Sequence, residues 1–178
     1  MATLVMVAKY PAPSKCKTRL AAGIGADGAA AFARAALCDL LVRLSTMSDL
    51  ARRVLLFAPI AQRGGFEEML RELGAAVEVA WELEPMQGIG SAGNVAGTGM
   101  DLGAFLTNAL RTCGQATPVV FIGTDCVTLS NDAILAAAHD AASGAAHICP
   151  AEDGGYVPTA AGGHSRARMQ YALLRWHS

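Results

Sequence analysis

Little in this sequence points to nucleic acid, to a membrane or to secretion. Charged residues make up 16% of the 178 residues and the formal net charge is −1, which argues against broad binding to nucleic acid or to a membrane surface. No apolar run approaches the roughly 18 residues of a membrane span. The first residues show no basic leader, apolar segment or cleavage site of a signal peptide. We therefore expect a cytoplasmic protein that binds neither nucleic acid nor a membrane.

The five cysteines and four histidines lack the spacing of a disulfide framework or a zinc site. No two cysteines form a CxxC pair, and an odd number fits free thiols in a reducing compartment better than disulfides. His139 and His147 are expected to be structural rather than metal ligands. Cys126 follows an aspartate, but no histidine is placed to activate its thiol, so we expect a small buried residue rather than a nucleophile.

Apolar residues are plentiful, at 53% of the chain, and short apolar runs alternate with helical patterns. The alternation predicts one α/β domain over 1–178, with a mostly parallel sheet and helices on both faces. The fully apolar run at 118–122 is expected at the centre of that sheet. Strands are predicted over 4–8, 54–58, 77–81, 118–122 and 146–149, and helices over 26–47, 66–73, 101–112 and from about 131 to 142.

Polar residues and glycines mark the ends of these helices. Asp27, Asp101 and either Ser130 or Asn131 are predicted as N-caps, because their side chains can accept hydrogen bonds from the first free backbone N–H groups. Gly74 is placed where a glycine commonly ends a helix.

A basic loop follows the first predicted strand, in the stretch LVMVAKYPAPSKCKTRL at 4–20. Lys9, Lys15, Lys17 and Arg19 are four of the 14 basic residues in the chain. Open α/β sheets bind their ligands at the carboxyl ends of strands, and cations gathered there suit a phosphate-rich ligand, with Arg19 able to grip two oxygens. The alternative is a solvated surface loop that happens to be basic.

Carboxylates follow two other predicted strands. Asp125 comes after the strand at 118–122 and Asp153 after the strand at 146–149, so both are expected near the basic loop at one edge of the sheet. One or two carboxylates there can hold Mg²⁺ or Mn²⁺ that bridges a diphosphate. The alternatives are a cap or turn for Asp125 and turn chemistry for the Asp-Gly-Gly at 153–155. Gly154 and Gly155 would let the backbone approach a ligand, or allow a positive φ.

The glycine-rich stretch GIGSAGNVAGTG at 88–99 contains a formal GxGxxG pattern. A dinucleotide site requires this pattern directly after a strand and at the start of a helix. Here Pro85 separates it from the preceding strand, further glycines follow, and no acidic residue lies about 20 positions on. We interpret the stretch as a loop, so an NAD-dependent oxidoreductase would rest on this rejected motif alone.

Four segments, in order, carry a resemblance to a known family: AKYPAPSKCKTRL, DLGAFLTNAL, VVFIGTDCVTL and PAEDGGY. Together they resemble the radical-SAM/selenodomain-associated transferases (type 1), an uncharacterised family related to nucleotide-diphospho-sugar transferases of the GT-A fold. More distantly they are similar to nucleotidyltransferases such as the phospholactate guanylyltransferases. The resemblance covers roughly 1–156 and implies a three-layer α/β/α, Rossmann-like fold. It also implies a metal-dependent glycosyltransferase or nucleotidyltransferase that uses a nucleotide diphosphate sugar or a nucleoside triphosphate.

The resemblance also implies roles for individual residues. The aspartate of the family's Gly-Ser/Thr-Asp motif, a metal ligand, is Asp125, and Asp153 would be a second ligand or a general base. Asp101 begins the family's Asp-Leu-Gly helix and joins the nucleotide-binding candidates, with helix capping as the alternative. The other nucleotide-binding positions are Lys9, Lys15, Lys17 and Arg19, and those facing the acceptor are Glu152, Gly154, Gly155 and Tyr156.

The chain departs from the family pattern toward its C-terminus. Val127 replaces a proline, and Val-Pro-Thr-Ala at 157–160 replaces an apolar strand, where Pro158 is expected to weaken a central strand. From about 157 the domain is therefore expected to be atypical or incomplete. The alternative function is a catalytically degenerate module that binds a nucleotide or a partner without turnover. A sheet edge left open by a missing C-terminal part would favour a homo-oligomer.

Overall fold

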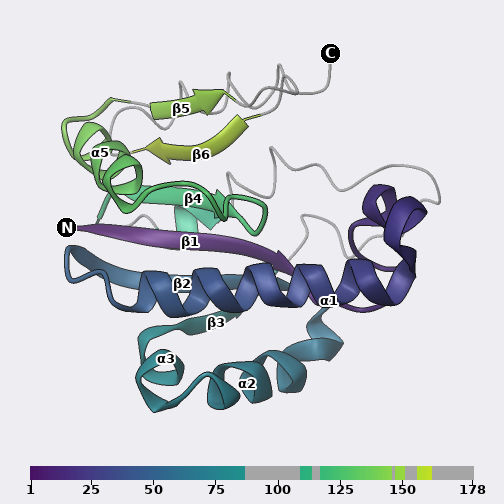
Figure 1. Cartoon of the computed structure of the whole chain (residues 1–178). Helices are drawn as coiled ribbons and strands as arrows, with labels where there is room; N and C mark the ends of the chain where they lie inside the picture. Colours follow the sequence, from purple (N-terminus) through teal and green to yellow (C-terminus); the bar gives the residue numbers. More distant parts are fainter. Residues whose placement is uncertain (87–108, 114–116, 146, 151–155, 162–178) are drawn as a thin grey trace.

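A single six-stranded sheet organises the molecule (Figure 1). The computed structural model describes residues 1–86, 109–113, 117–145, 147–150 and 156–161, the last two ranges as backbone. The strand order is β3-β2-β1-β4-β6-β5. The strands are β1 (Ala2–Lys9), β2 (Leu50–Ala58), β3 (Glu82–Pro85), β4 (Val119–Gly123), β5 (His147–Pro150) and β6 (Tyr156–Ala161).

The sheet is mostly parallel, as the sequence predicts. Strand β1 pairs in parallel with both β2 and β4, and β2 pairs in parallel with β3. Strand β6 runs antiparallel to its two neighbours, β4 and β5. The chain thus moves outward from β1 through β2 to β3 and then returns to the other side of β1 as β4. Strand order therefore reverses between β1 and β4, which is the position where open α/β sheets bind ligands.

Helices cover both faces of the sheet, which makes three layers. The inward side chains of α1, α2, α3 and α5 pack in one core cluster with Leu4, Met6 and Phe57 of the sheet. The helical residues 109–113 pack in a second cluster, against Val5 and Phe121 on the opposite face. The helices on the first face are α1 (Thr18–Ser45), α2 (Arg63–Glu72), α3 (Ala75–Ala80) and α5 (Asn131–Ala142), and a short 3₁₀ turn, η1 (Ile60–Gln62), precedes α2.

Strand β4 is the buried central strand that its apolar sequence predicts. Val119, Val120, Phe121 and Ile122 are all buried, alternating between the two core clusters. Burying each such side chain stabilises the fold by about 1.5–3 kcal/mol relative to leaving it exposed. This strand and β1 form the rigid base from which the candidate site projects.

Helix α1 begins earlier than expected. The sequence predicts a helix from Ala26 with Asp27 as its N-cap, whereas α1 starts at Thr18 and contains a non-helical residue, Gly25, with φ 79° and ψ 164°. Glycine adopts this conformation at little steric cost. The expected start therefore corresponds to the second of two helical segments. Asp27 lies in the first turn of that segment rather than at its cap, a position where a carboxylate still interacts favourably with the helix dipole.

Among the described residues, α1 is also the one helix long and apolar enough, by length and composition alone, to cross a membrane. A search of the sequence for uninterrupted apolar runs does not find this helix, because charged residues interrupt it. Leu37, Leu40, Leu41 and Leu44 of α1 are buried against the sheet. Packing in the core therefore accounts for part of its apolar character, whereas Ile24, Phe32 and Val42 of the same helix are exposed.

The predicted strand at 77–81 is wrong. Its residues form most of the short helix α3 and the turn into β3. Val77 is 6% exposed whereas Val79 is 86% exposed, although two residues that are two apart in a strand would lie on the same face. The alternation of apolar and acidic residues resembled a strand because two turns of a helix are too short to distinguish the two periods.

Pro158 lies within a strand, contrary to the expectation that it would weaken one there. In the pairing of β5 with β6, Ile148 faces Thr159 and Cys149 faces Val157, so the register shifts and Pro158 has no partner. The described pairing of β4 with β6 likewise ends at Thr159. A β-bulge tolerates proline because the extra residue donates no ladder hydrogen bond. The sequence pattern therefore did not predict β6, although this strand lies between β4 and β5 in the sheet.

Helix α5 matches its prediction closely. The Ser130 hydroxyl accepts a hydrogen bond from the Ala133 backbone N–H at 3.2 Å, which identifies Ser130 as the N-cap. Gly144, just after the helix, has a positive φ of 86°. Gly74 similarly follows α2 with a φ of 106°, so polar and glycine signals marked these helix ends correctly.

Candidate functional site

The basic loop leaves β1 at the carboxyl edge of the sheet and is anchored there by its first residue. The Tyr10 backbone N–H donates to the Ala58 carbonyl oxygen at 2.7 Å, which holds the loop against the end of β2. The Tyr10 ring packs edge-on against Phe66 of α2, with centroids 5.3 Å apart. A Cβ atom at Gly65 would lie 2.5 Å from the Tyr10 ring, so this close approach requires glycine.

Inside the loop, short-range hydrogen bonds fold the chain back toward α1. The Lys15 backbone N–H donates to the Ala12 carbonyl oxygen at 3.1 Å, and the Cys16 thiol donates to the same oxygen at 3.4 Å. Ser14 and Lys17 have φ values of 61° and 46°. Such left-handed conformations are uncommon for residues other than glycine and cost roughly 1 kcal/mol or more each. They turn the loop so that Lys17 immediately precedes the first turn of α1.

Asp125 lies in the turn after β4, on the neighbouring strand. This turn is held by a hydrogen bond from the Cys126 backbone N–H to the Gly123 carbonyl oxygen at 3.3 Å. Arg43 of α1 donates from Nη1 to the Leu129 carbonyl oxygen at 2.6 Å, which fixes the end of the same segment. The Asp125 side chain is 72% exposed, so the carboxylate projects into solvent from a constrained backbone.

The structure brings Lys17 and Asp125 together as an ion pair between Nζ and Oδ1. The two residues come from the loops that follow β1 and β4, which pair side by side with Val7 opposite Gly123. Burial lowers the pKa of the Lys17 ammonium, and the neighbouring thiols of Cys16 and Cys126 act in the opposite direction. The predicted meeting of the basic loop and a carboxylate at one edge therefore occurs, at the point where strand order reverses.

The other three predicted cations lie at the same edge and form no such ion pair with a described residue. Lys9 is the last residue of β1, Lys15 lies in the loop, and Arg19 lies in the first turn of α1. All three are exposed and form no ion pair with another described residue. Their charges are available to a ligand in solvent.

Several predicted site residues lie outside the described part of the chain: Asp101, Glu152, Asp153, Gly154 and Gly155, together with the stretch at 88–99. Tyr156 is described as the first residue of β6, opposite Pro150 at the end of β5. Since β5 and β4 both run antiparallel to β6, β5 ends at the carboxyl edge of β4. The chain thus leaves β5 on the side of the sheet where the predictions place the acceptor residues.

The described residues contain no group of three or more histidine, cysteine, aspartate or glutamate side chains that could hold a metal ion. At the candidate site they offer one carboxylate, Asp125. Mg²⁺ is commonly bound by one or two carboxylates plus water and substrate phosphates, whereas zinc and calcium sites need more protein ligands. The donor set therefore suits a divalent cation that is shared with a bound phosphate group.

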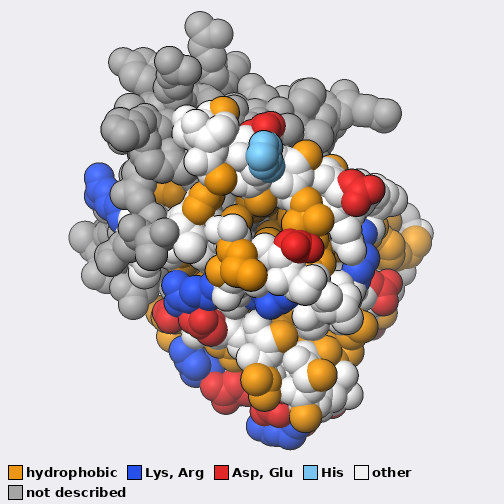
Figure 2. Space-filling model, turned by 90° about the vertical axis from the view of Figure 1, so that its left-hand side faces the viewer, with side chains coloured by type: hydrophobic (Ala, Val, Ile, Leu, Met, Phe, Trp, Pro, Cys, Tyr) orange, Lys and Arg blue, Asp and Glu red, His pale blue; other side chains and the backbone are white. Residues whose placement is uncertain are grey.

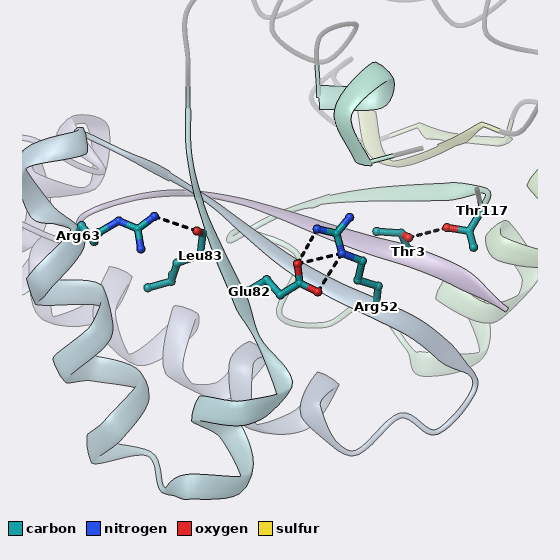
Figure 3. A network of polar contacts seen from close by, with 6 residues as sticks. All are labelled: Thr3, Arg52, Arg63, Glu82, Leu83 and Thr117. Atoms are coloured by element: carbon teal, nitrogen blue, oxygen red, sulfur yellow. Dashed lines mark hydrogen bonds and ion pairs between the residues drawn. The ribbon is translucent and has the colours of Figure 1, made fainter. Parts of the chain in front are cut away.

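Two further residues at this edge were not singled out from the sequence, Tyr10 and Arg63. Arg63 lies over the Phe57 ring at 5.4 Å and donates to the Leu83 carbonyl oxygen at 3.1 Å (Figure 3). It also pairs with Glu67 one turn along α2. These contacts give Arg63 a structural role in joining α2 to β3. In the sequence, Tyr10 is an aromatic residue between Lys9 and a proline. That pattern is too common to predict that Tyr10 holds the loop against β2 and α2.

The opposite end of the sheet has a different character. Figure 2 shows charged side chains of both signs interspersed with hydrophobic ones on the face at the amino ends of the parallel strands. At that end the Thr3 and Thr117 hydroxyls form a hydrogen bond of 2.6 Å (Figure 3). Arg43 and Arg53 also form no ion pair with a described residue, but both donate to backbone carbonyl oxygens, whereas Lys9, Lys15 and Arg19 at the carboxyl edge are exposed.

Comparison with solved structures finds the same fold in two other proteins. A protein from Desulfovibrio desulfuricans G20, described as a candidate nucleotide-diphospho-sugar transferase, is 26% identical with a TM-score of 0.72 over 90% of this chain. The 4-diphosphocytidyl-2C-methyl-D-erythritol synthase from Anaerococcus prevotii DSM 20548 is 10% identical with a TM-score of 0.51, over 98% of this chain and 74% of its own. These matches confirm the predicted GT-A-like fold.

The chain spans 63% of the length of the Desulfovibrio protein. No curated protein matches the sequence. A family pattern matches residues 77–170, slightly more than half of the chain. The chain therefore belongs to the family described as "Uncharacterized protein conserved in bacteria (DUF2064)".

Proposed function

We propose that this chain forms the nucleotide site of a metal-dependent transferase, either a glycosyltransferase or a nucleotidyltransferase. The observation that carries the proposal is the meeting of Lys17 and Asp125 where strand order reverses between β1 and β4. A ligand at this position would meet the cations of the basic loop and an exposed carboxylate together. A nucleotide diphosphate sugar or a nucleoside triphosphate, bound with Mg²⁺ or Mn²⁺, has the complementary charges.

In this proposal the basic loop binds the phosphates. Lys9, Lys15 and Arg19 are exposed and unpaired among the described residues, and Arg19 can contact two phosphate oxygens at once. The first turn of α1 begins beside Lys17, and the dipole of a helix favours anions at its N-terminus. Asp101 remains a candidate for the nucleotide side of the site on the resemblance alone.

Asp125 is proposed as the chief ligand of the divalent cation. When bound, the cation would offset negative charge on the leaving phosphate. On the family resemblance, Asp153 would be a second ligand or would accept the proton of the acceptor hydroxyl as general base. The acceptor itself would face Glu152, Gly154, Gly155 and Tyr156, and its identity is left open.

The similarity to the Desulfovibrio protein supports a nucleotide-sugar substrate, and the fold shared with the Anaerococcus synthase accommodates a nucleotidyltransferase equally well. The finer resemblance to the radical-SAM/selenodomain-associated transferases stays a prediction. Because this chain spans 63% of the Desulfovibrio protein, a second candidate is a module that binds a nucleotide without turnover. The two candidates share the binding site and differ in whether an acceptor is modified.

A thermal-shift screen tests the binding part of the proposal. Nucleoside diphosphates, nucleoside triphosphates and sugar nucleotides are each added with Mg²⁺, with Mn²⁺ or with chelator. A ligand at 100 times its dissociation constant stabilises the folded state by about 2.7 kcal/mol. The proposal predicts a shift that requires both a nucleotide and a metal, and the absence of any shift would reject it.

Turnover then separates the two candidates. With the nucleotide identified by the screen, release of pyrophosphate would indicate a nucleotidyltransferase. Release of nucleoside diphosphate from a sugar nucleotide would indicate a glycosyltransferase. Stable binding without either product, over a range of acceptor alcohols and phosphates, would favour the non-catalytic module.

A further inference from the structure

The ion pair between Lys17 and Asp125 joins the two groups that the proposed function assigns to different ligands. We infer that this pair is a latch that couples metal binding to phosphate binding, since each partner competes with the ligand that the proposed function assigns to the other. The inference rests on the proposed function and adds regulation of the same site.

The surroundings of the two side chains support an exchangeable contact. Asp125 is 72% exposed, whereas Lys17 is 23% exposed, so a cation in solvent can approach the carboxylate from its open side. The Lys17 side chain is more buried than that of Asp125, and its backbone is held in a left-handed conformation at the start of α1. A lysine ammonium is a point charge on a flexible stem, without the two-pronged grip of a guanidinium. The contact can therefore break without rearrangement of either loop.

Breaking the pair imposes a cost that two ligands can share. A metal ion that binds Asp125 alone competes with the ammonium for the charge of the carboxylate, and an anion that binds Lys17 alone competes with the carboxylate for the charge of the ammonium. When both bind together, the pair is broken once and each released charge meets a ligand of opposite sign. The metal should therefore raise the affinity for the phosphate, and the phosphate should raise the affinity for the metal by the same factor.

The size of the effect follows from the exposure of the pair. Exposed ion pairs of this kind change an equilibrium by a factor of roughly 1.5 to 5. The carboxylate also repels a phosphate directly, so its removal could help anion binding without any latch. A double-mutant cycle separates these two contributions because only the latch requires Lys17.

The experiment measures pyrophosphate binding by calorimetry in the presence of chelator, at low ionic strength. It uses the wild-type chain and the variants Asp125→Asn, Lys17→Met and the combination of both. The latch predicts that Asp125→Asn binds metal-free pyrophosphate roughly 1.5- to 5-fold more tightly than wild type. In the Lys17→Met background the same change should give a smaller gain, because only the direct repulsion between the carboxylate and the phosphate remains to be removed. A gain of equal size in both backgrounds would mean simple charge repulsion and would overturn the latch.

The reciprocal arm measures Mn²⁺ binding without any phosphate. Lys17→Met should bind Mn²⁺ more tightly than wild type by a similar factor of about three, because Asp125 no longer has a competing partner. Lys15→Met is the matched control, since it removes one positive charge from the same loop and leaves the pair intact. Equal gains from the two variants would contradict the latch. Circular dichroism verifies that each variant folds. We expect Asp125→Asn to fold because the Asp125 side chain is largely exposed.

The outcomes distinguish the latch from the proposed function. If wild type binds a nucleotide with metal but Asp125→Asn gains no metal-free affinity for pyrophosphate, the latch is rejected and the proposed function stands. If wild type binds no nucleotide under any metal condition, the proposed function and the latch are rejected together.

Discussion

Two ion pairs in this molecule join neighbouring segments of the sheet, and they differ in construction. Arg52 of β2 grips Glu82 of β3, with Nε 2.9 Å from both carboxylate oxygens and Nη2 2.5 Å from Oε2 (Figure 3). Lys17 meets Asp125 through one nitrogen and one oxygen. The first pair connects two strands that are already in register, and the second connects two loops at the reversal of strand order.

The contrast indicates which pair serves the fold and which is available to ligands. A two-pronged arginine–carboxylate contact has fixed geometry and is difficult for a ligand to replace. A single lysine contact beside an exposed carboxylate is easier to exchange with a phosphate and a cation. Position in the sheet agrees with this division, because β3 is an edge strand whereas β1 and β4 lie inside the sheet.

The largest expected effect is on nucleotide binding. Lys17→Met should weaken binding of the nucleotide in the presence of Mg²⁺ by about 10- to 100-fold, because a hydrogen bond to a charged group contributes roughly 1.5–3 kcal/mol. Calorimetric titration measures the change. Arg52→Met is the matched control and should bind the nucleotide as wild type does, so an equal loss in both variants would contradict the division.

Metal dependence provides the second test. Asp125→Asn should bring the nucleotide affinities with Mg²⁺ and with chelator to within about twofold of each other, since the amide is a far poorer ligand for Mg²⁺ than the carboxylate. Glu82→Gln removes the same charge from the other pair and should retain the wild-type ratio. Titrations in the two buffers measure both ratios, and an Asp125→Asn variant with undiminished metal dependence would show that another residue holds the cation.

Stability should respond in the opposite order. Arg52→Met is expected to lower the free energy of unfolding by about 0.2–1 kcal/mol, because both partners are partly exposed to solvent. Urea unfolding measures this change, and a double-mutant cycle with Glu82→Gln isolates the pair itself. Lys17→Met should change the free energy of unfolding by less than Arg52→Met, and a larger loss would identify the Lys17 pair as the structural one.

The smallest expected effect concerns pH. The hydrogen bond from Arg52 holds the pKa of Glu82 below its usual value of 4.5. A carboxyl group with a lowered pKa in the folded state stabilises the fold above its unfolded pKa, and this contribution is lost as pH falls through the folded value. Wild type should therefore lose slightly more stability than Glu82→Gln between pH 5 and pH 3. Parallel pH profiles of urea unfolding would contradict this assignment.

The fold could be predicted well where one pattern was long or unambiguous. The apolar runs in β1 and β4, the leucines of α1 and the cap at Ser130 each agreed with their surroundings, so local and tertiary preferences coincided. Prediction failed at 77–81, where helix and strand periods cannot be separated over five residues. It also failed at β6, because the pairing register that places Pro158 at a bulge depends on two distant strands.

The site could be predicted only in part, for a related reason. That Lys17 and Asp125 would lie near one edge followed from the parallel order of β1 and β4. Their direct contact depends on the left-handed conformation of Lys17 and on the turn at Asp125. These are loop features that hydrophobic patterns do not encode. The contact between the Lys17 and Asp125 side chains could therefore be identified only from the structure.

The most direct test of the central claim is a calorimetric comparison of wild type and Asp125→Asn. The nucleotide identified by thermal shift is titrated into each protein with Mg²⁺ and again with chelator. We predict metal-dependent binding for wild type and metal-independent binding for the variant. Binding by wild type that is indifferent to metal, or identical titrations of the two proteins, would contradict a metal-assisted nucleotide site between β1 and β4.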